Sequence, residues 1–152
     1  MRIVVAADHN GVVIKQQLAD WLRHGGHEVD DRGTHGDETV DYPPLCQQVA
    51  AEVVEGRADR AIFVGGTGAG EHIAFNKIAG IRAGLGEQPL TTEISRAHND
   101  ANVLVLGAKV VDTEQALELT ALWLRTPFKG GRHQRRLEQI AALERGERLD
   151  QS

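Results

Sequence analysis

Residues 60–78 read RAIFVGGTGAGEHIAFNKI, and this stretch decides the fold class. The run 60–64 is short, apolar and rich in branched side chains, which is typical of a strand buried on both faces of a sheet. Four glycines follow between residues 65 and 70, and a helix is expected from about Glu71 to Ile78. A buried strand that leads through a short loop into a helix is the repeating element of a parallel α/β sheet.

The remainder of the chain repeats this order of strand, loop and helix. Further strands are expected at 2–7, 27–33, 80–86 and 102–107, and further helices at 10–26, 43–53, 89–100, 112–126 and 132–147. Strands that alternate with helices through short loops form βαβ units, in which the strands are parallel and helices cover both faces. The sequence therefore predicts an α/β fold with a five-stranded parallel sheet and a C-terminal helix.

Composition narrows the classes of function. The chain has 152 residues, the length of one compact domain, which we expect to span 1–152 with a disordered tail after about residue 146. A net charge of -5 and an aromatic content of 4% argue against a nucleic-acid partner, which needs a basic surface or base-stacking rings. Cys46 is the single cysteine, so no disulfide forms within the chain, and we expect an ordinary packed thiol.

Motifs for other classes of protein are absent from the sequence. The apolar run 2–7 is too short for a signal peptide or a membrane span, so we expect a cytoplasmic protein with no membrane partner. No HExxH motif and no cluster of Cys and His at metal-ligand spacing occurs, so we expect no bound metal.

Four segments follow the expected strands, at the edge where parallel α/β sheets bind their ligands. They are 8–11, 65–71, 86–89 and the segment after Leu106. The glycines of the second segment can aim several backbone N–H groups at one anion, with help from the N-terminus of the following helix. A tight turn that needs positive φ angles is the plainer interpretation of the same glycines.

The residues that end the glycine loop limit which anion it holds. A Walker loop ends in Gly-Lys-Ser/Thr, whereas this loop ends in Gly70-Glu71-His72. Read as a dinucleotide fingerprint, its third glycine comes one place early, and the Glu71 carboxylate would repel a pyrophosphate. Glu71 has two interpretations: an acid that complements the helix dipole, or a general base beside amides that hold an enolate oxygen.

Histidines and arginines supply further candidates. His9 follows the first strand and His98 precedes the last one, so together with the glycine loop they could supply proton donors near one pocket. Arg132 and Arg136 are four residues apart and therefore share one helix face. That pair suits a phosphate, but it is also typical of a solvated basic face.

Taken in chain order, the motifs AADHNG, DYP, GGTGAGE, NK, SRAHNDANVLVLG and GGRHQRR resemble those of the type B ribose-5-phosphate isomerases. The galactose-6-phosphate isomerase subunits belong to the same superfamily. The resemblance runs from about residue 2 to residue 145 and rests on several motifs at matching spacings. It implies a Rossmann-like three-layer αβα sandwich, a homodimer or homotetramer with sites shared between subunits, and no cofactor.

The resemblance also implies a reaction, in which an aldose phosphate and a ketose phosphate interconvert through a cis-enediolate. Asp8 and His9 match residues that bind the sugar and help to open its ring, and His98 matches the proton donor for ring opening. Residues 66–70 match an anion hole for the enediolate. The catalytic residues implied are Glu71, His98, Asp8 and Thr67. The substrate-binding residues implied are Asp8, His9, Tyr42, Gly66, Thr67, Gly68, Ala69, Gly70, Asn99, Lys109, Arg132 and Arg136, the two arginines acting as a phosphate clamp for a neighbouring subunit.

The base distinguishes two branches of the family. One branch uses a cysteine at the start of the glycine loop, where this chain has Gly65. The other branch uses a glutamate at the end of the loop, and Glu71 matches it. The resemblance therefore implies that Glu71 is the catalytic base.

Two departures from the family pattern bear on the substrate. Lys109 stands where many members carry an Arg near the phosphate, and Phe75 stands where an Ala is usual. If Phe75 faces the pocket it shortens the space for the sugar, and if it faces the core it only packs. Ribose 5-phosphate is the expected substrate, with the four-carbon pair erythrulose 4-phosphate and erythrose 4-phosphate or a six-carbon sugar phosphate as alternatives. A non-catalytic module that binds a sugar phosphate is the alternative of a different class.

Overall fold

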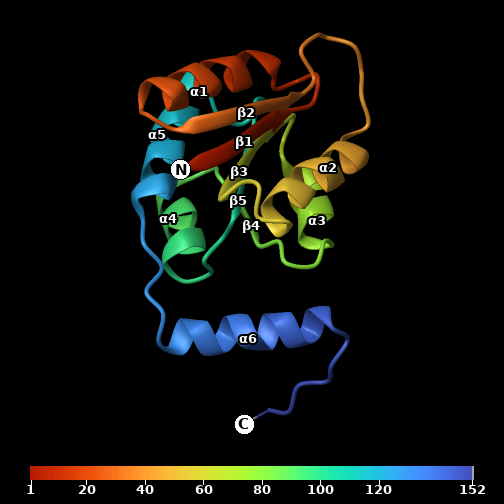
Figure 1. Cartoon of the computed structure of the whole chain (residues 1–152), viewed down its shortest axis with the longest axis vertical. Coiled ribbons are helices and arrows are strands. Elements are labelled where there is room, and N and C mark those ends of the chain that lie inside the picture. The colour runs from red at the N-terminus through yellow and green to blue at the C-terminus, as the bar shows by residue number, and fades with distance from the viewer. Residues whose placement is uncertain (152) are drawn as a thin grey trace.

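The computed structural model describes residues 1–151, which form five strands and six helices (Figure 1). The strands are β1 (Arg2–Ala7), β2 (Glu28–Gly33), β3 (Arg60–Gly65), β4 (Ala83–Leu85) and β5 (Val103–Gly107). The helices are α1 (Val12–His24), α2 (Tyr42–Val54), α3 (Ala69–Asn76), α4 (Pro89–Ala97), α5 (Thr113–Arg125) and α6 (Arg132–Glu144). Residues 147–151 have no regular secondary structure, and Ser152, the end of the predicted tail, lies outside the described residues. No helix in the described chain is long and apolar enough to cross a lipid bilayer.

The strands form one parallel sheet in the order β2-β1-β3-β5-β4. Helices α1 and α5 cover one face, and α2 and α3 cover the other (Figure 1). Helix α4 packs against β4 and α5. The predicted Rossmann-like sandwich of three layers with a five-stranded parallel sheet is thereby confirmed.

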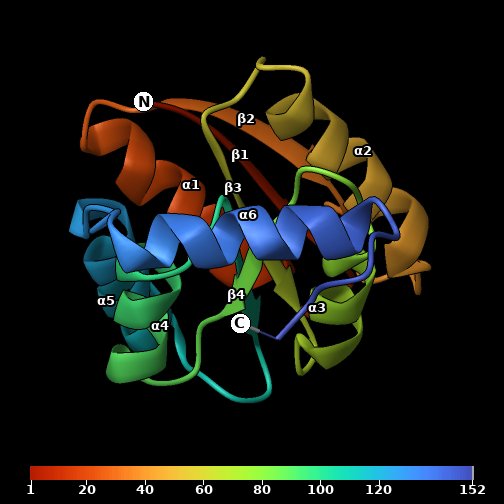
Figure 2. The same cartoon turned by 90° about the horizontal axis from the view of Figure 1, so that it is seen from below.

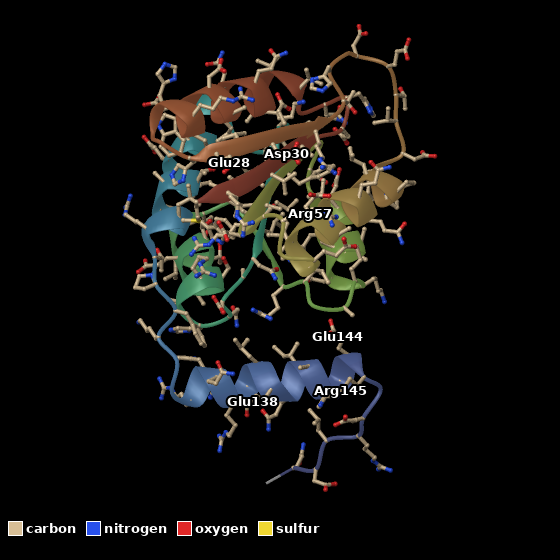
Figure 3. All side chains as sticks on the ribbon, viewed as in Figure 1. Glu28, Asp30, Arg57, Glu138, Glu144 and Arg145 are labelled. Carbon is tan, nitrogen blue, oxygen red and sulfur yellow. The ribbon has the colours of Figure 1, made fainter. Side chains whose placement is uncertain are left out.

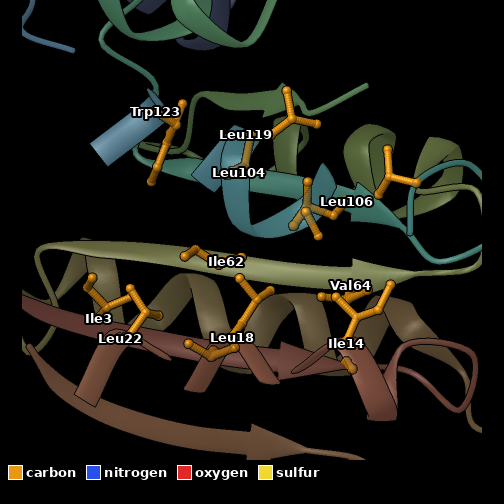
Figure 4. Packing of buried hydrophobic residues seen from close by; sticks show 14 of the residues in the cluster. Ile3, Ile14, Leu18, Leu22, Ile62, Val64, Leu104, Leu106, Leu119 and Trp123 are labelled. Atoms are coloured by element: carbon orange, nitrogen blue, oxygen red, sulfur yellow. The ribbon is translucent and has the colours of Figure 1, made fainter. Parts of the chain in front are cut away.

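The central strands are apolar at successive positions because helices cover both faces of the sheet. In β3, Ile62 and Val64 belong to the core beneath α1 and α5, whereas Ala61 and Phe63 belong to the core beneath α2 and α3. Figure 4 shows the first of these cores, in which side chains of α1 and α5 pack on alternate residues of β1, β3 and β5. The two cores hold the sheet in place, and the loops extend from its two edges.

The chain order of the strands leaves a crevice between β1 and β3. From β1 the chain goes to β2 on one side, and it returns to place β3 on the other side of β1. Loops that leave two neighbouring strands toward opposite faces of the sheet diverge, and ligands of such sheets bind between them. The Asp8 N–H donates to the Val64 carbonyl at 3.2 Å. The segments 8–11 and 65–71 therefore lie side by side, as the strand-edge rule predicts.

Helix α4 is shorter than predicted, and its end determines where two site candidates lie. It ends at Ala97 instead of about Asp100, so His98 and Asn99 belong to a turn. Asp100 has a φ of 45°, which a helix cannot include. The Arg96 guanidinium holds the turn, because it donates to the Asp100 carboxylate at 2.8 Å and to the Ala101 carbonyl at 2.7 Å.

Helix α6 lies beyond the β4 edge of the sheet and crosses from the side of α4 to the side of α3 (Figures 1 and 2). Near its N-terminal end, the Lys129 N–H donates to the Ala97 carbonyl at 2.9 Å. Near its C-terminal end, both carboxylate oxygens of Glu144 lie 3.2 Å from the Gly80 nitrogen. Figure 3 shows Glu144 directed toward the sheet domain, while Glu138 lies on the far side of the helix.

Lys15 on α1 is a fully buried lysine. Its ammonium lies 2.7 Å from a carboxylate oxygen of Asp31 on β2. It also lies 3.3 Å from the Arg32 carbonyl oxygen and 3.2 Å from Nδ1 of His35. This buried pair therefore joins α1 to the end of β2 and to the loop that follows it.

Replacing Lys15 by Met should lower the free energy of unfolding by about 3 kcal/mol, because the Asp31 carboxylate loses its partner in a largely buried place. The double variant Lys15→Met/Asp31→Leu should recover most of that loss, since no unpaired charge remains. Lys77→Met at an exposed lysine is the control and should change stability by less than about 0.5 kcal/mol. Urea unfolding measures all three, and a Lys15→Met protein as stable as the unaltered chain contradicts the role given to this pair.

Candidate active site

The carboxyl edge of the sheet carries the first group of predicted site residues. Asp8 follows β1, the glycine loop 65–70 follows β3, and Lys109 follows β5. The Lys109 N–H donates to the Gly66 carbonyl at 2.9 Å, which joins the third segment to the second. Tyr42 completes the group, because its ring lies against the last glycine of the loop.

The glycine loop depends on close approaches that side chains would block. Gly68 has a φ of 84° directly before α3, a conformation that favours glycine. A Cβ on Gly70 would lie 3.1 Å from Cε2 of Tyr42 and closer still to the hydroxyl of that ring. Because α3 begins at Ala69, two residues earlier than predicted, Glu71 lies in its first turn. The N–H groups of a first helical turn have no acceptor within the helix, so they can bind an anion at the loop.

Glu71 and Asp8 form a buried carboxyl pair. Only 3% of Glu71 and 4% of Asp8 is exposed, and the two carboxyl groups are hydrogen-bonded partners. Asp8 Oδ1 also accepts the Asn10 N–H at 2.8 Å. Burial raises the pKa of Glu71, a backbone N–H lowers it, and the hydrogen bond and negative charge of Asp8 raise it further. The net rise moves the pKa of Glu71 toward neutral pH, which suits a general base.

Gly65 leaves the space that the Glu71 carboxylate fills. A Cβ at position 65 would lie 2.8 Å from Oε2 of Glu71 and closer still to Oε1. Real Cβ atoms do not approach other atoms so closely, so any side chain at position 65 would displace this carboxylate. A cysteine at position 65 and a carboxylate in the observed position of Glu71 are therefore alternatives for the same space.

Cys46 of α2 is fully buried near the carboxyl pair. Burial raises the pKa of its thiol to about 12, and the negative charges of Glu71 and Asp8 contribute to the rise. The thiol therefore stays protonated at neutral pH and cannot serve as a thiolate base. The prediction that Cys46 is a packed thiol is confirmed.

His9 and Lys109 bring hydrogen-bond donors to the mouth of the glycine loop. Nδ1 of His9 accepts the Val40 N–H at 3.3 Å, and Nε2 lies 3.4 Å from Nδ2 of Asn10. Lys109 extends across Gly66, because a Cβ on that glycine would lie 3.8 Å from Cε of the lysine. A flexible cation thus lies where an anionic group of a ligand would meet the loop.

Phe75 faces the core. It is fully buried, and its ring lies edge-on to that of Phe63 with the centroids 5.6 Å apart. It belongs to the core that α2 and α3 form on the sheet. Of the two alternatives for this residue, the structure supports packing, so Phe75 does not shorten the space for a sugar.

The second group of predicted residues lies at the opposite, amino edge of the sheet. Helix α4 starts at the carboxyl edge after β4, so its C-cap residue, His98, lies near the starts of the strands. The Asn99 carbonyl accepts the Nε–H of Arg82, the residue directly before β4, at 2.9 Å. The prediction that His9 and His98 meet near one pocket is therefore wrong within a single chain. The physical reason is that each helix between parallel strands returns to the amino edge.

Arg132 and Arg136 belong with this second group. Both are exposed and lie in the first two turns of α6. The chain segment before α6 is bonded to Ala97, the last residue of α4. The structure thus brings the arginines to the side of His98 and Asn99, and it separates all four from the carboxyl pair.

A cavity of about 790 Å³ lies between β4, α3, α4 and α6. Its lining includes Asn99 of the second group, but neither member of the carboxyl pair. Within residues 1–151, no three His, Cys, Asp or Glu side chains gather closely enough to hold a metal ion. The candidate base therefore does not line this cavity.

Sequence reasoning missed two residues that contact predicted site residues. Asn10 donates its backbone N–H to Asp8 at 2.8 Å and its side-chain Nδ2–H at 3.5 Å, and His133 stacks on the ring of His98. Both lie inside motifs that the sequence analysis quotes, AADHNG and GGRHQRR. Two sequence features could have indicated them: Asn10 lies two residues after Asp8, and His133 lies between Arg132 and Arg136.

Comparison with known proteins assigns the chain to a family. A family model described as Ribose/Galactose Isomerase matches residues 3–140. Ribose-5-phosphate isomerase B of Escherichia coli (strain K12) is 43% identical over 143 residues, which is 94% of this chain and 96% of that protein. The solved structure of the Clostridium thermocellum ribose-5-phosphate isomerase B is 44% identical with a TM-score of 0.94, covering 96% of this chain and 99% of that chain. The Mycoplasma genitalium enzyme, solved with bound ribulose-5-phosphate, is 34% identical with a TM-score of 0.90, covering 95% and 96% of the two chains. The predicted resemblance is confirmed.

The raised pKa of Glu71 predicts that Glu71→Gln stabilises the fold at neutral pH. A carboxyl whose pKa is higher in the folded state adds stability below its unfolded pKa and loses it as the pH rises through the folded pKa. A glutamine carries no such charge, so the variant should unfold at a higher denaturant concentration than the unaltered chain at about pH 8, and at the same concentration at about pH 4. Glu87→Gln, at an exposed acid, is the control and should change neither. Loss of stability in Glu71→Gln, or a gain that does not depend on pH, contradicts the burial of an ionised Glu71.

Proposed function

We propose that this chain, which belongs to the ribose/galactose isomerase family, is an aldose–ketose isomerase that interconverts ribose 5-phosphate and ribulose 5-phosphate. The observation that carries the proposal is the buried carboxyl pair of Glu71 and Asp8 beside a glycine loop and a helix N-terminus. Relatives named ribose-5-phosphate isomerase B support the reaction, and the Mycoplasma genitalium structure with bound ribulose-5-phosphate supports the five-carbon substrate.

In the proposed chemistry, Glu71 moves the proton between carbons. Its carboxylate takes the proton from C2 of the open-chain aldose, the electron pair of that bond forms the C1–C2 double bond, and the C1 carbonyl becomes an oxyanion. The cis-enediolate is then protonated at C1 by the same carboxyl group, and the proton of the C2 hydroxyl passes to the oxygen on C1, which leaves the ketose. Backbone N–H groups of residues 66–70 stabilise the oxyanion where its charge develops.

Asp8 and His9 hold the sugar against this machinery. Asp8 is the hydrogen-bond partner of Glu71, so it accepts from Glu71 whenever that carboxyl carries the substrate proton. Because Nδ1 of His9 accepts the Val40 N–H, Nε2 is the ring nitrogen left to contact the sugar, beside the Asn10 amide at 3.4 Å. Thr67 belongs to the glycine loop and Tyr42 lies against its last glycine, and both complete the contacts to the sugar in the proposed site.

We further propose that one site uses two copies of the chain. The base and the anion hole lie at the carboxyl edge, whereas the proposed proton donor His98, the sugar contact Asn99 and the phosphate clamp of Arg132 and Arg136 lie at the amino edge. A homodimer or homotetramer that sets the amino edge of one copy against the carboxyl edge of another completes the set.

Exposed apolar side chains support this pairing. Val13 and Leu90 are both 68% exposed in the first turns of α1 and α4, and Val110 is 46% exposed after β5, all at the carboxyl edge. On α6, Leu143 is 58% exposed and Ile140 is 45% exposed. Exposed apolar side chains thus occur both at the carboxyl edge and on α6, the helix that carries the two arginines. Such side chains are suited to burial between two copies of the chain.

A four-carbon substrate is the second candidate, and Lys109 is the observation that favours it. The lysine crosses Gly66, where a family arginine would hold a phosphate with two parallel hydrogen bonds. A lysine makes a single adjustable contact, which tolerates a phosphate at a different distance from the reacting carbons. The position of Phe75 in the core removes the other argument for a shorter sugar.

Solvent exchange tests the base directly. Unaltered protein in D₂O should introduce deuterium at C1 of ribulose 5-phosphate, and Glu71→Gln should slow this exchange by about 10²–10⁴-fold, the usual contribution of general acid–base catalysis. NMR of the sugar measures the exchange, and Glu87→Gln is the matched control. Exchange that continues undiminished in Glu71→Gln contradicts the assignment of the base.

The same assay over four-, five- and six-carbon sugar phosphates identifies the substrate. The proposal expects the highest kcat/KM for the five-carbon pair. A higher value for the four-carbon pair would establish the second candidate, and exchange with no sugar phosphate would favour a binding module.

A further inference from the structure

His98 and His133 lie face to face at the amino edge of the sheet. Their ring centroids are 3.9 Å apart and the ring planes differ by 12°. His98 follows the last turn of α4, and His133 lies in the first turn of α6. His133 is only 7% exposed, whereas His98 is half-buried, so of the two residues His98 is the more accessible.

The stack joins the end of α4 to the start of α6. A hydrogen bond from the Lys129 N–H to the Ala97 carbonyl, at 2.9 Å, joins the same segments. The α4 end is itself fixed, because the Arg96 guanidinium bonds both Asp100 and the backbone of Ala101. Residues 96–101 and 129–136 thus form a connected unit, which we name the amino-edge unit.

Electrostatics favour a neutral His133 within the amino-edge unit. Burial lowers the pKa of His133, and the positive charges of His98, Arg132, Arg136 and Lys129 lower it further. Two imidazolium rings at 3.9 Å would repel each other, so the stack is compatible with a neutral His133. His133 therefore offers the ring of His98 a flat, uncharged ring to stack on.

We propose that His133 is a positioning residue that fixes the ring of His98 and joins it to the arginines of α6, so that each chain delivers a preassembled half-site to its partner. This inference rests on the proposed function, in which His98 donates the proton that opens the sugar ring and Arg132 and Arg136 bind the phosphate. Proton transfer to a ring oxygen requires the donor to lie within about 1 Å of its productive place, since displacement by that distance can cost about 10²-fold in rate.

The geometry separates the effect of His133 from that of Glu71. Glu71 lies at the carboxyl edge, so loss of the stack leaves its carboxylate and the glycine loop in place. Ribulose 5-phosphate has no free hydroxyl at C5 and is an open-chain ketose, so exchange of its C1 proton needs Glu71 but no ring opening. Conversion of cyclic ribose 5-phosphate needs both steps.

The test compares His133→Ala, which removes the stack, with His133→Phe, which retains a flat ring. Glu138→Ala, at an exposed position of α6 outside the amino-edge unit, is the control. For each protein, turnover of ribose 5-phosphate and deuterium exchange into ribulose 5-phosphate are measured. His133→Ala should lose about 10–100-fold in turnover and less than about 3-fold in exchange, and His133→Phe should restore most of the turnover. NMR should also show the His98 ring protons shifted in the Ala variant and near their original position in the Phe variant.

Three results would overturn the inference while the proposed function stands. They are full turnover in His133→Ala, an equal loss of turnover and exchange in that variant, and a Phe variant as slow as the Ala variant. An equal loss of the two rates would mark a merely structural residue. Absence of both turnover and exchange in the unaltered protein would instead overturn the proposed function, and the inference with it.

Discussion

The candidate site depends on the hydrogen-bonded pair of Glu71 and Asp8, two carboxyl groups that are almost fully removed from water at the ends of neighbouring segments. Burying such a pair is costly unless one member carries a proton, so burial and the neighbouring Asp8 both raise the pKa of Glu71. The pair also constrains its surroundings. Gly65 must lack a side chain so that the Glu71 carboxylate has space, and burial, together with the negative charges of the pair, keeps the thiol of Cys46 neutral.

The parallel topology explains why a single chain places the proposed site residues in two groups, one at each edge of the sheet. Strands β1, β3 and β5 deliver Asp8, the glycine loop and Lys109 to the carboxyl edge. Helix α4 returns to the amino edge and places His98 there, and α6 begins beside it. Because a rigid sheet separates the two groups, no loop adjustment within one chain can unite them, and a second copy of the chain is the simplest source of the missing half.

Strand periodicity and the strand-edge rule were sufficient to predict the parallel sheet and to place Asp8 beside the glycine loop. They could not place His98, since its position depends on where α4 ends, and that end is set by the Arg96 contacts with a turn that the helical pattern concealed. The direction of Phe75 was equally open, because it depends on the rotation of a short helix against α2 and the sheet. The role of His133 needed a contact between two distant segments, which no local pattern reveals.

Mixing two inactive variants tests the divided site most directly. Glu71→Gln lacks the base at the carboxyl edge, and Arg136→Ala lacks part of the clamp at the amino edge. In a mixed dimer one of the two sites has both edges intact, so an equal mixture with random exchange should recover about a quarter of the unaltered activity. Glu71→Gln mixed with Asp8→Asn, two variants of the same edge, should recover none. If mass spectrometry shows mixed dimers and the first mixture stays inactive, the two edges do not form a shared site.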